Sequence, residues 1–268
     1  MTKKEVIKNA MGLAEESAGN YISAEAAITP EYSGMKIYDS PIFAFGCPNE
    51  ELYVKYKSPD IIGDWFLTPL EWLPRVKTVI SFFLPYTERI KRANAQNHDW
   101  PADEWLHGRY EGQVFLNNLS VGIQNFLEKA GYKSLVPALD PRYSLDRTDV
   151  GFASNWSERH AAFACGLGTF GLSKGIITEK GMCGRLGSVL TELDLPKDRR
   201  LYKEIYEYCT MCGECINHCP AEAISFAEGK RHMPCSDFID NVREKSKPRF
   251  GCGKCQVSVP CESKIPLL

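Results

Sequence analysis

A run of four cysteines near the carboxyl end limits what this chain can fold into more than any other feature. The run reads CTMCGECINHCP and spans residues 209–220. Cysteines separated by two, two and three residues and followed by proline are typical of [4Fe–4S] ligands, and the fourth cysteine of such a run binds a second cluster. The run therefore predicts parts of two metal sites, and each site needs ligands from elsewhere in the chain.

Four cysteines downstream of the run are enough to complete both sites. Following the crossed ligation of two-cluster ferredoxins, we assign the eight cysteines to two sets. The first set contains Cys209, Cys212, Cys215 and Cys261, and the second set contains Cys219, Cys235, Cys252 and Cys255. The gap between Cys255 and Cys261 is wider than the gap that ends the run, so the presence of clusters is better supported than this partition. Tetrahedral zinc is the alternative, but its ligands usually come as two separated pairs.

The cysteines also indicate a domain boundary. Three of the eleven, Cys47, Cys165 and Cys183, precede residue 200, whereas eight lie between residues 209 and 261. We expect an α/β domain over residues 1–200 and a small ferredoxin-like domain with two clusters over residues 201–268. Free cysteine is among the most buried residue types, so Cys165 is expected to pack in the core. Cys47 and Cys183 stand beside glycines, where a ligand could approach the backbone.

Charge and hydropathy patterning exclude two broad classes of partner. A formal net charge of −2 without long runs of like charge gives no field that would attract nucleic acid. The first twenty residues place charges between apolar positions, and no stretch approaches the ~18 apolar residues of a membrane span. We therefore predict a cytoplasmic protein without membrane contact. In that reducing compartment, eleven cysteines are better explained by metal binding than by disulfides.

The residues before the run predict a mixture of strands and helices. Short segments rich in Val, Ile and Leu predict strands over residues 77–86, 132–139, 174–181 and 185–195. Apolar residues at steps of three and four predict helices near the amino terminus, over residues 102–130 up to Gly131, and over residues 157–165. The Pro- and Gly-rich residues 28–72 predict irregular structure. Together these elements favour an α/β or α+β core.

A glycine-rich segment follows the helix over residues 157–165. Its GLGTFG sequence matches a dinucleotide-binding pattern, but such a pattern must follow a strand and open a helix, whereas here a helix ends. The simpler interpretation is that these glycines cap the helix and allow close approach of something flat, either neighbouring backbone or a cofactor.

The order of these motifs resembles epoxyqueuosine reductases and, more distantly, reductive dehalogenases. The resemblance rests on Ser157-Glu158-Arg159, GLGTFGLSKG, GSVLTELDL, the cysteine run and the terminal CxxC. It implies a nitroreductase-like α/β domain that holds cobalamin, and two [4Fe–4S] clusters that pass electrons to it. The residues that it places at the cofactor are Gly166, Gly168, Gly171, Lys174, Gly187 and Ser188. Arg159 is a further candidate, because it could contact an amide or carboxylate of a cofactor, although a structural ion pair with neighbouring Glu158 is the simpler interpretation.

The sequence departs from that family at the proton donor. The family has an acid six residues before the position of Glu158, and this chain has Phe152 there. Asp149 is the nearest acid that could replace it as a catalytic residue, although aspartate in such a segment is more often a solvated turn residue. No helical repeat follows the cysteines and no basic patch is present, so a tRNA substrate is not favoured.

Two functions remain open from the sequence. The favoured one is a cobalamin-dependent reductase, an oxidoreductase that receives electrons from a low-potential donor of the ferredoxin or flavodoxin type and reduces a small-molecule substrate that the sequence does not identify. The alternative is an electron-transfer partner protein of the ferredoxin type, without corrinoid catalysis of its own. Bound corrinoid would distinguish the two.

Overall fold

A four-stranded antiparallel sheet forms the centre of the computed structural model, which describes residues 1–148 and 151–267. Its strands lie in the order β1 (Ile42–Gly46), β2 (Thr78–Pro85), β8 (Gly184–Thr191) and β3 (Ser134–Leu135). The strands β2 and β8 pair over their full length, from Thr78 opposite Thr191 to Pro85 opposite Gly184. Branched and aromatic residues fill β2, and every one of its positions is buried, as expected for a strand covered on both faces.

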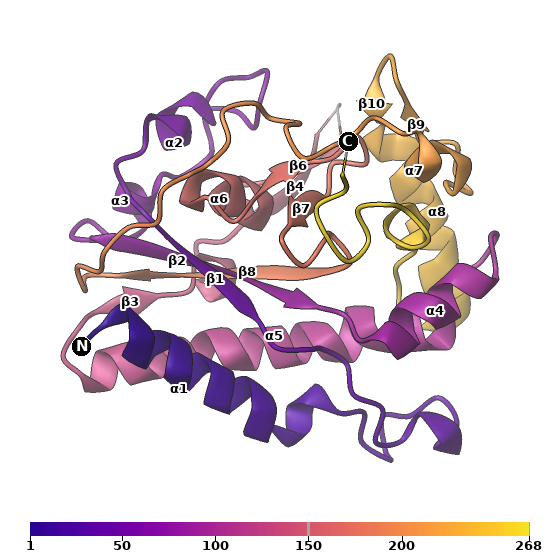
Figure 1. Ribbon diagram of the computed structural model, residues 1–268, viewed down its shortest axis with the longest axis horizontal. Coiled ribbons are helices and arrows are strands. Elements are labelled where there is room, and N and C mark those ends of the chain that lie inside the picture. Colours follow the sequence, from indigo (N-terminus) through magenta and orange to yellow (C-terminus); the bar gives the residue numbers. More distant parts are fainter. Residues whose placement is uncertain (149–150, 268) are drawn as a thin grey trace.

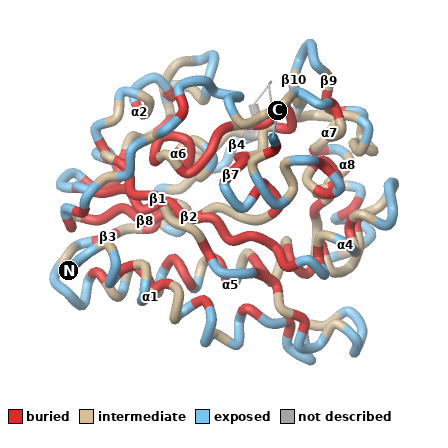
Figure 2. Tube along the Cα trace, in the orientation of Figure 1, coloured by how far each residue is buried: buried red, intermediate tan, exposed pale blue. Residues whose placement is uncertain are grey.

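Helices cover both faces of this sheet (Figure 1). Helices α1 (Lys3–Glu16) and α5 (Asp103–Lys129) lie below it in that view, and α6 (Glu158–Cys165), α2 (Glu51–Lys55) and α3 (Pro69–Trp72) lie above it. Successive side chains of β2 point to opposite faces, so Ile80 and Phe82 pack in the core with α1 and α5, and Val79 and Phe83 pack in the core with α6. Figure 2 shows the buried residues as a continuous band along the sheet and the facing sides of the helices.

The cysteine-rich residues form a cap at one end of the sheet, beside α4 (Glu88–Gln96) (Figure 1). The cap contains α7 (Glu214–Asn217), α8 (His232–Ser246) and the hairpin of β9 (Ile224–Ser225) and β10 (Gly229–Lys230). Two further hairpins lie near it, β4 (Leu145–Thr148) with β5 (Gly151–Ser154), and β6 (Gly168–Phe170) with β7 (Ile176–Thr178). Short 3₁₀ helices occur at Ala18–Asn20, Pro30–Tyr32, Pro137–Leu139 and Lys254–Gln256.

The structure confirms a mixed α/β fold and corrects two expectations in detail. The segment 28–72 is not wholly irregular, because it supplies the edge strand β1 and the helices α2 and α3. The segment 132–139 forms a two-residue strand followed by a 3₁₀ helix, since Pro137 lacks the N–H that a longer ladder would need. Within the described residues, no helix is long and apolar enough to cross a membrane.

Candidate functional site

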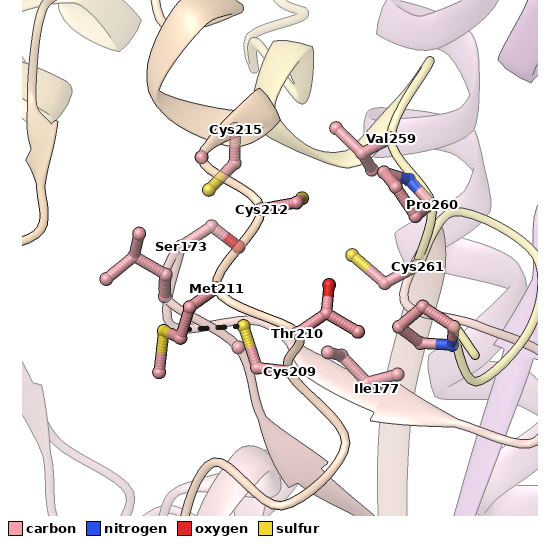
Figure 3. A pocket seen from close by; sticks show the side chains of 14 residues that line it. Ser173, Ile177, Cys209, Thr210, Met211, Cys212, Cys215, Val259, Pro260 and Cys261 are labelled. Carbon is pink, nitrogen blue, oxygen red and sulfur yellow. Dashed lines mark hydrogen bonds between the residues drawn. The ribbon is translucent and has the colours of Figure 1, made fainter. Parts of the chain in front are cut away.

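The first set of cysteines surrounds one cavity of the cap. Cys209, Cys212, Cys215 and Cys261 all line it, together with apolar residues that include Ile177 and Val259. In Figure 3, Cys212 and Cys215 lie on one side of an open space, with Cys261 across from them and Cys209 below. The chain can wrap around this space because Met211 takes a left-handed backbone conformation, with φ of 52°. Three consecutive cysteines of the run thereby face a common centre, which Cys261 completes from the carboxyl end.

Two thiols of this set resist ionisation in the protein alone. Burial, and then the neighbouring cysteines, raise the pKa of Cys215 and that of Cys261 to about 12. Thiolates bind metals, so these two groups need the positive charge of a metal centre to release their protons. The donor set and its apolar lining fit an iron–sulfur cluster.

The second set lines a separate cavity of about 710 Å³. Cys219 ends the run, Cys235 lies on α8, and Cys252 and Cys255 come from the loop after it. The backbone N–H of Ala223 donates to Sγ of Cys219 over 3.3 Å, and Nζ of Lys230 lies 4.0 Å from Sγ of Cys255. The Cys255 thiolate raises the pKa of Lys230, so this lysine stays charged and can offset the negative charge of a Cys₄ cluster.

The spacing of the thiols suits a cluster better than a single ion. Among the residues that the structure describes, no three His, Cys, Asp or Glu side chains converge closely enough to hold one metal ion. A tetrahedral zinc site requires its four ligands to meet around one atom, whereas a [4Fe–4S] cube holds its four thiolates at separate corners. Cysteines that surround a cavity without meeting are the arrangement expected for the cube.

A thin wall separates the two cysteine cavities. Leu172, Ile224 and Cys255 form a buried cluster there, and Cys209, Cys215 and Cys219 pack against it. Members of both sets therefore contact one group of side chains. Clusters bound at the two sets would be neighbours, as electron transfer between them requires.

A third cavity, open to solvent and of about 1010 Å³, adjoins the second. Gly184, Arg185, Lys230 and Gln256 line both cavities. The third cavity is otherwise bounded by α6, by the turn before β7, and by aromatic residues that include Phe83 and Trp156. It lies on the α6 side of the sheet, between the large domain and the cap.

Three buried polar atoms around the third cavity have no hydrogen-bond partner in the described part of the chain. They are Oε2 of Glu158, Nε of Arg185 and Oε1 of Gln256. Buried polar atoms are normally paired, and leaving each one unpaired costs about 1–3 kcal/mol. Apolar walls with a few convergent polar groups are typical of a cofactor or substrate site, and these residues fit a large ligand that carries amides.

Glu158 stands out among these groups because its acidity is altered. Burial raises the pKa of its carboxyl to about 7, while contacts with Ser188 and Trp156 act in the opposite direction. A carboxyl of this kind holds its proton near neutral pH and can still release it. Nearby His160 has its pKa lowered to about 3, by burial and by Arg159, and is therefore neutral.

The structure brings together some of the cofactor residues that the resemblance implied. Arg159 and Lys174 line the third cavity. Ser188 lies behind its wall, where it accepts a hydrogen bond of 3.0 Å from Nε1 of Trp156. Asp149, the candidate catalytic acid, lies outside the described residues.

The glycines implied by the resemblance face other parts of the chain. Gly166 caps α6 with φ of 90°, which is the simpler of its two interpretations. A Cβ at Gly168 would lie 2.2 Å from the carbonyl oxygen of Ile177, and one at Gly187 would lie 2.5 Å from the Phe82 ring. Gly171 lines the cavity of the first set. These positions need glycine because the chain packs closely against itself, and none of the four lines the third cavity.

Two cations of the cavities had no signal in the sequence. Arg185 on β8 and Lys230 on β10 come from distant segments, and single cations between apolar residues look like ordinary surface positions. Arg109 on α5 belongs to Gly108-Arg109-Tyr110, a stretch that is part of the resemblance but was assigned no role. Glu158 was visible in the motif, but its burial follows from the packing of α6 against the sheet.

Comparisons with known proteins confirm the resemblance. The model of a 4Fe-4S binding domain matches residues 202–225. An epoxyqueuosine reductase from Bacillus cereus is 25% identical over 215 residues, which are 76% of this chain and 53% of that protein. A tetrachloroethene reductive dehalogenase from Desulfitobacterium hafniense is 38% identical over 65 residues, 24% of this chain and 12% of that protein. The chain thus spans about half the length of the first of these relatives.

Solved structures show the same fold. A selenomethionine-labelled epoxyqueuosine reductase matches with a TM-score of 0.55 and 19% identity, covering 99% of this chain and 67% of that one. A catabolic reductive dehalogenase matches with a TM-score of 0.56 and 14% identity, covering 98% of this chain and 37% of that one. The chain is therefore similar to both groups in fold, and it carries a 4Fe-4S binding segment.

Proposed function

We propose that this chain is an iron–sulfur reductase in which the two cysteine sets hold [4Fe–4S] clusters and the third cavity holds a cobalamin. The observation that carries the proposal is the order of the cavities, because the first set shares a wall with the second, and the second shares four lining residues with the third. A solved reductive dehalogenase with the same fold, at a TM-score of 0.55, is described as suggesting a mechanism for B12-dependent dehalogenation. The arrangement therefore supports a reductase over an isolated electron carrier.

The chain's own residues divide the tasks at the third cavity. Phe83, Trp156 and Leu186 would hold a planar ring by apolar contact, and Glu158, Arg185 and Gln256 would pair with its amides. When bound, the cobalamin would supply the cobalt-centred reduction chemistry, and the protein would supply binding, orientation and protons.

Proton delivery has two candidates in this arrangement. Glu158 can hold a proton on Oε2 inside the cavity, since its pKa is raised to about 7. Asp149 remains a proposal from the sequence. In sequence it falls between β4 and β5, and Ser154 at the end of β5 lines the third cavity. An epoxyqueuosine reductase from Bacillus subtilis with the same fold has been solved with its aspartate-bearing catalytic loop swung out of the active site.

Electrons would enter at the first set. Cys212 is exposed, whereas Cys255 of the second set is buried, so a cluster on the first set is the one that a protein donor could approach. A low-potential donor of the ferredoxin or flavodoxin type fits that role. The outer cluster would accept the electron, and the inner one would hold it beside the third cavity.

The direct test is titration of anaerobically prepared protein with cob(II)alamin, followed by electron paramagnetic resonance. We expect saturable binding to the wild type with a changed axial ligation signal. Ala138 lines the third cavity and Leu139, next to it, is exposed, so Ala138→Trp should abolish binding and Leu139→Trp should not. Gly168→Trp is unsuitable as a probe, because the Ile177 carbonyl leaves no room even for a Cβ.

The titration also separates the two functions left open by the sequence. If protein that carries its clusters binds no corrinoid, the electron-transfer interpretation replaces the reductase. If Ala138→Trp and wild type bind equally well, the corrinoid site lies elsewhere in the molecule.

A further inference from the structure

A fourth cavity, of about 820 Å³, continues from the third, and five cations are among its lining residues. We refer to it as the cationic cavity. Its cationic side chains come from five separate elements or turns, and they are Arg109, Arg159, Lys174, Lys230 and Arg243. Arg159, Lys174 and Lys230 also line the third cavity. A ligand could therefore occupy both cavities at once.

The protein neutralises little of this charge. Asp240 is the one carboxylate among the described lining residues, and it forms an ion pair with Arg243. His232 adds no negative charge and is neutral, since burial, and then nearby cations, lower its pKa to about 4. Five cations less one carboxylate leave an excess of four positive charges. Lys230 also lies against the second set, with Nζ 4.0 Å from Sγ of Cys255.

Arg109 is the clearest example of a positive charge in this cavity that no carboxylate of the described residues neutralises. Its guanidinium lies 4.5 Å from the centre of the Phe250 ring, and it has no hydrogen bond or ion pair with any described residue. Arg243 stacks on the same ring at 4.7 Å. Arg159 donates over 2.8 Å to the carbonyl oxygen of Lys174, and among the described residues no other hydrogen bond of its guanidinium occurs. The forked donors of arginine match the oxygens of carboxylate and phosphate.

Holding these cations together is unfavourable in the protein alone. Burial, and then the charge of Arg185, lower the pKa of Arg109 to about 9. Burial, and then Arg159 and Lys230, lower the pKa of Lys174. Burial is the larger cause of both shifts and the like charges add to it, so the charged forms of both side chains are disfavoured. An anion bound between these side chains would remove that cost.

We propose that the cationic cavity binds an anionic group, phosphate or carboxylate, of the substrate that is reduced in the third cavity. The substrate is then an organic anion. That the ligand is a substrate rests on the proposed function. That the ligand is an anion rests on the arrangement of the cations. Arg159 and Lys174 stand between the two cavities, so an anion held by them leaves the rest of the molecule beside Glu158.

The first experiment measures binding of inorganic phosphate to anaerobic, cluster-containing protein by isothermal titration calorimetry. We expect saturable binding that weakens as salt is raised. Lys174→Gln and Arg109→Gln should each weaken it about tenfold, as loss of one charged hydrogen bond predicts. Arg231→Gln is the matched control, since Arg231 neighbours Lys230 in sequence but pairs with Glu228 and lines none of these cavities. No saturable binding, or equal weakening by all three variants, would overturn the proposal.

A second experiment separates the substrate from the phosphate of the cofactor. Phosphate is titrated against protein loaded with cobalamin and against protein loaded with cobinamide, which lacks the phosphate-bearing nucleotide loop. Equal phosphate affinity in both supports a substrate site. Competition by cobalamin but not by cobinamide assigns the cavity to the cofactor and overturns the substrate assignment. If phosphate binds and neither corrinoid does, the anion site stands and the proposed function fails.

Discussion

At the scale of single residues, Glu158 combines a role in the fold with a role in the site. Its backbone begins α6, and its carboxyl reaches a cavity where Oε2 has no partner among the described residues. The resemblance pointed to this segment, yet it placed glycines rather than this acid at the cofactor. Those glycines correctly predicted close packing, but they did not predict the cavity. A glycine indicates that other atoms lie close to its backbone, and it does not show whether these atoms belong to the protein or to a ligand.

The raised pKa of Glu158 predicts a pH dependence of stability. Its folded pKa of about 7 lies above the ordinary value of 4.5 for a glutamate carboxyl. Between these values the folded state binds the proton more tightly than the unfolded state. The contribution is therefore fully present below the unfolded pKa and is lost as pH rises through the folded pKa. We expect the melting temperature of the wild type to fall, relative to that of Glu158→Gln, by about 5–10 °C between about pH 5 and pH 8.

Circular dichroism melting curves of both proteins at a series of pH values provide the measurement. The difference between the two proteins is the relevant quantity, because His160 and His232, with lowered pKa values, act in the opposite direction in both. Parallel pH profiles would show that Glu158 titrates normally. They would also remove it as a proton donor near neutral pH.

At the scale of elements, a polar network joins α5 to the loop that carries the second set. Arg249 donates to both carboxyl oxygens of Glu111, through Nε over 3.2 Å and through Nη2, and also to the carbonyl oxygen of Ala26. Buried His107 lies 3.1 Å from the same carboxyl. Burial acts to raise the pKa of Glu111, but the hydrogen bonds of His107 and Arg249 hold this pKa below its ordinary value. The network positions the backbone immediately before Cys252.

Removal of Arg249 should therefore affect both stability and metal content. Arg249→Met leaves the largely buried carboxylate of Glu111 without its cation, and we expect a loss of about 2 kcal/mol, or about 4–8 °C in melting temperature. Iron should be lost first from the second set. Arg75→Met removes an exposed ion pair with Glu192 and should change little. A double variant with Glu111→Leu should recover part of the loss, and a further loss would contradict this account.

Two helical glycines provide a test of the packing around α5. At Gly112 of α5, a Cβ would lie 2.5 Å from the buried Tyr38 hydroxyl oxygen and 3.2 Å from Ile37. At Gly12 of α1, a Cβ would meet nothing within 4 Å. Gly12→Ala should stabilise by about 0.5–1 kcal/mol through helix propensity. Gly112→Ala should destabilise by about 1–2 kcal/mol, since overpacking outweighs the same gain. Thermal melting of both variants measures the two changes in stability. Equal changes would contradict the close contact of Gly112 with Tyr38 and Ile37.

The elements differed in how well the sequence predicted them. The strands β2 and β8 and the helices α5 and α6 have long or strongly patterned apolar runs that match a strand or helix period. The edge strand β1 was missed because it is short and lies among Pro and Gly. The hairpin of β4 and β5 was also missed, since its pairing is local and its side chains carry little apolar signal.

At the scale of the whole molecule, the cavities adjoin one another, and the cationic cavity shares lining residues with both the second and the third. The cysteines could be found in the sequence, because their chemistry depends on spacing within short segments. Arg159 and Lys174 were also named from the sequence, whereas Arg185 and Lys230 were not, because β8 and β10 meet the other elements there only after the chain has folded. A site of this kind becomes visible from the tertiary structure.

The two sets predict the metal content of the protein. Eight cysteines form them, and each complete set holds a cube of four iron atoms, so anaerobic protein should contain about eight iron and eight sulfide per chain. Cys212→Ser should remove about half of the iron while leaving the second set, and Cys235→Ser should do the reverse. Iron and sulfide analysis with resonance spectra of the reduced variants is the measurement. About four iron in the wild type, or stoichiometric zinc, would contradict both sets.

The crossed composition of the sets also bears on the order in which a ribosome makes their ligands. Cys209, Cys212, Cys215 and Cys219 emerge together, but the native site of the first three is completed by Cys261, and that of Cys219 by later cysteines. A growing chain that has reached Cys219 therefore offers four adjacent thiols, but the fourth of them, Cys219, belongs to the second set rather than to the first. A cube inserted at that moment would recruit Cys219 and leave Cys235, Cys252 and Cys255 one ligand short. Correct assembly thus favours delivery of iron and sulfide after Cys261 has left the ribosome.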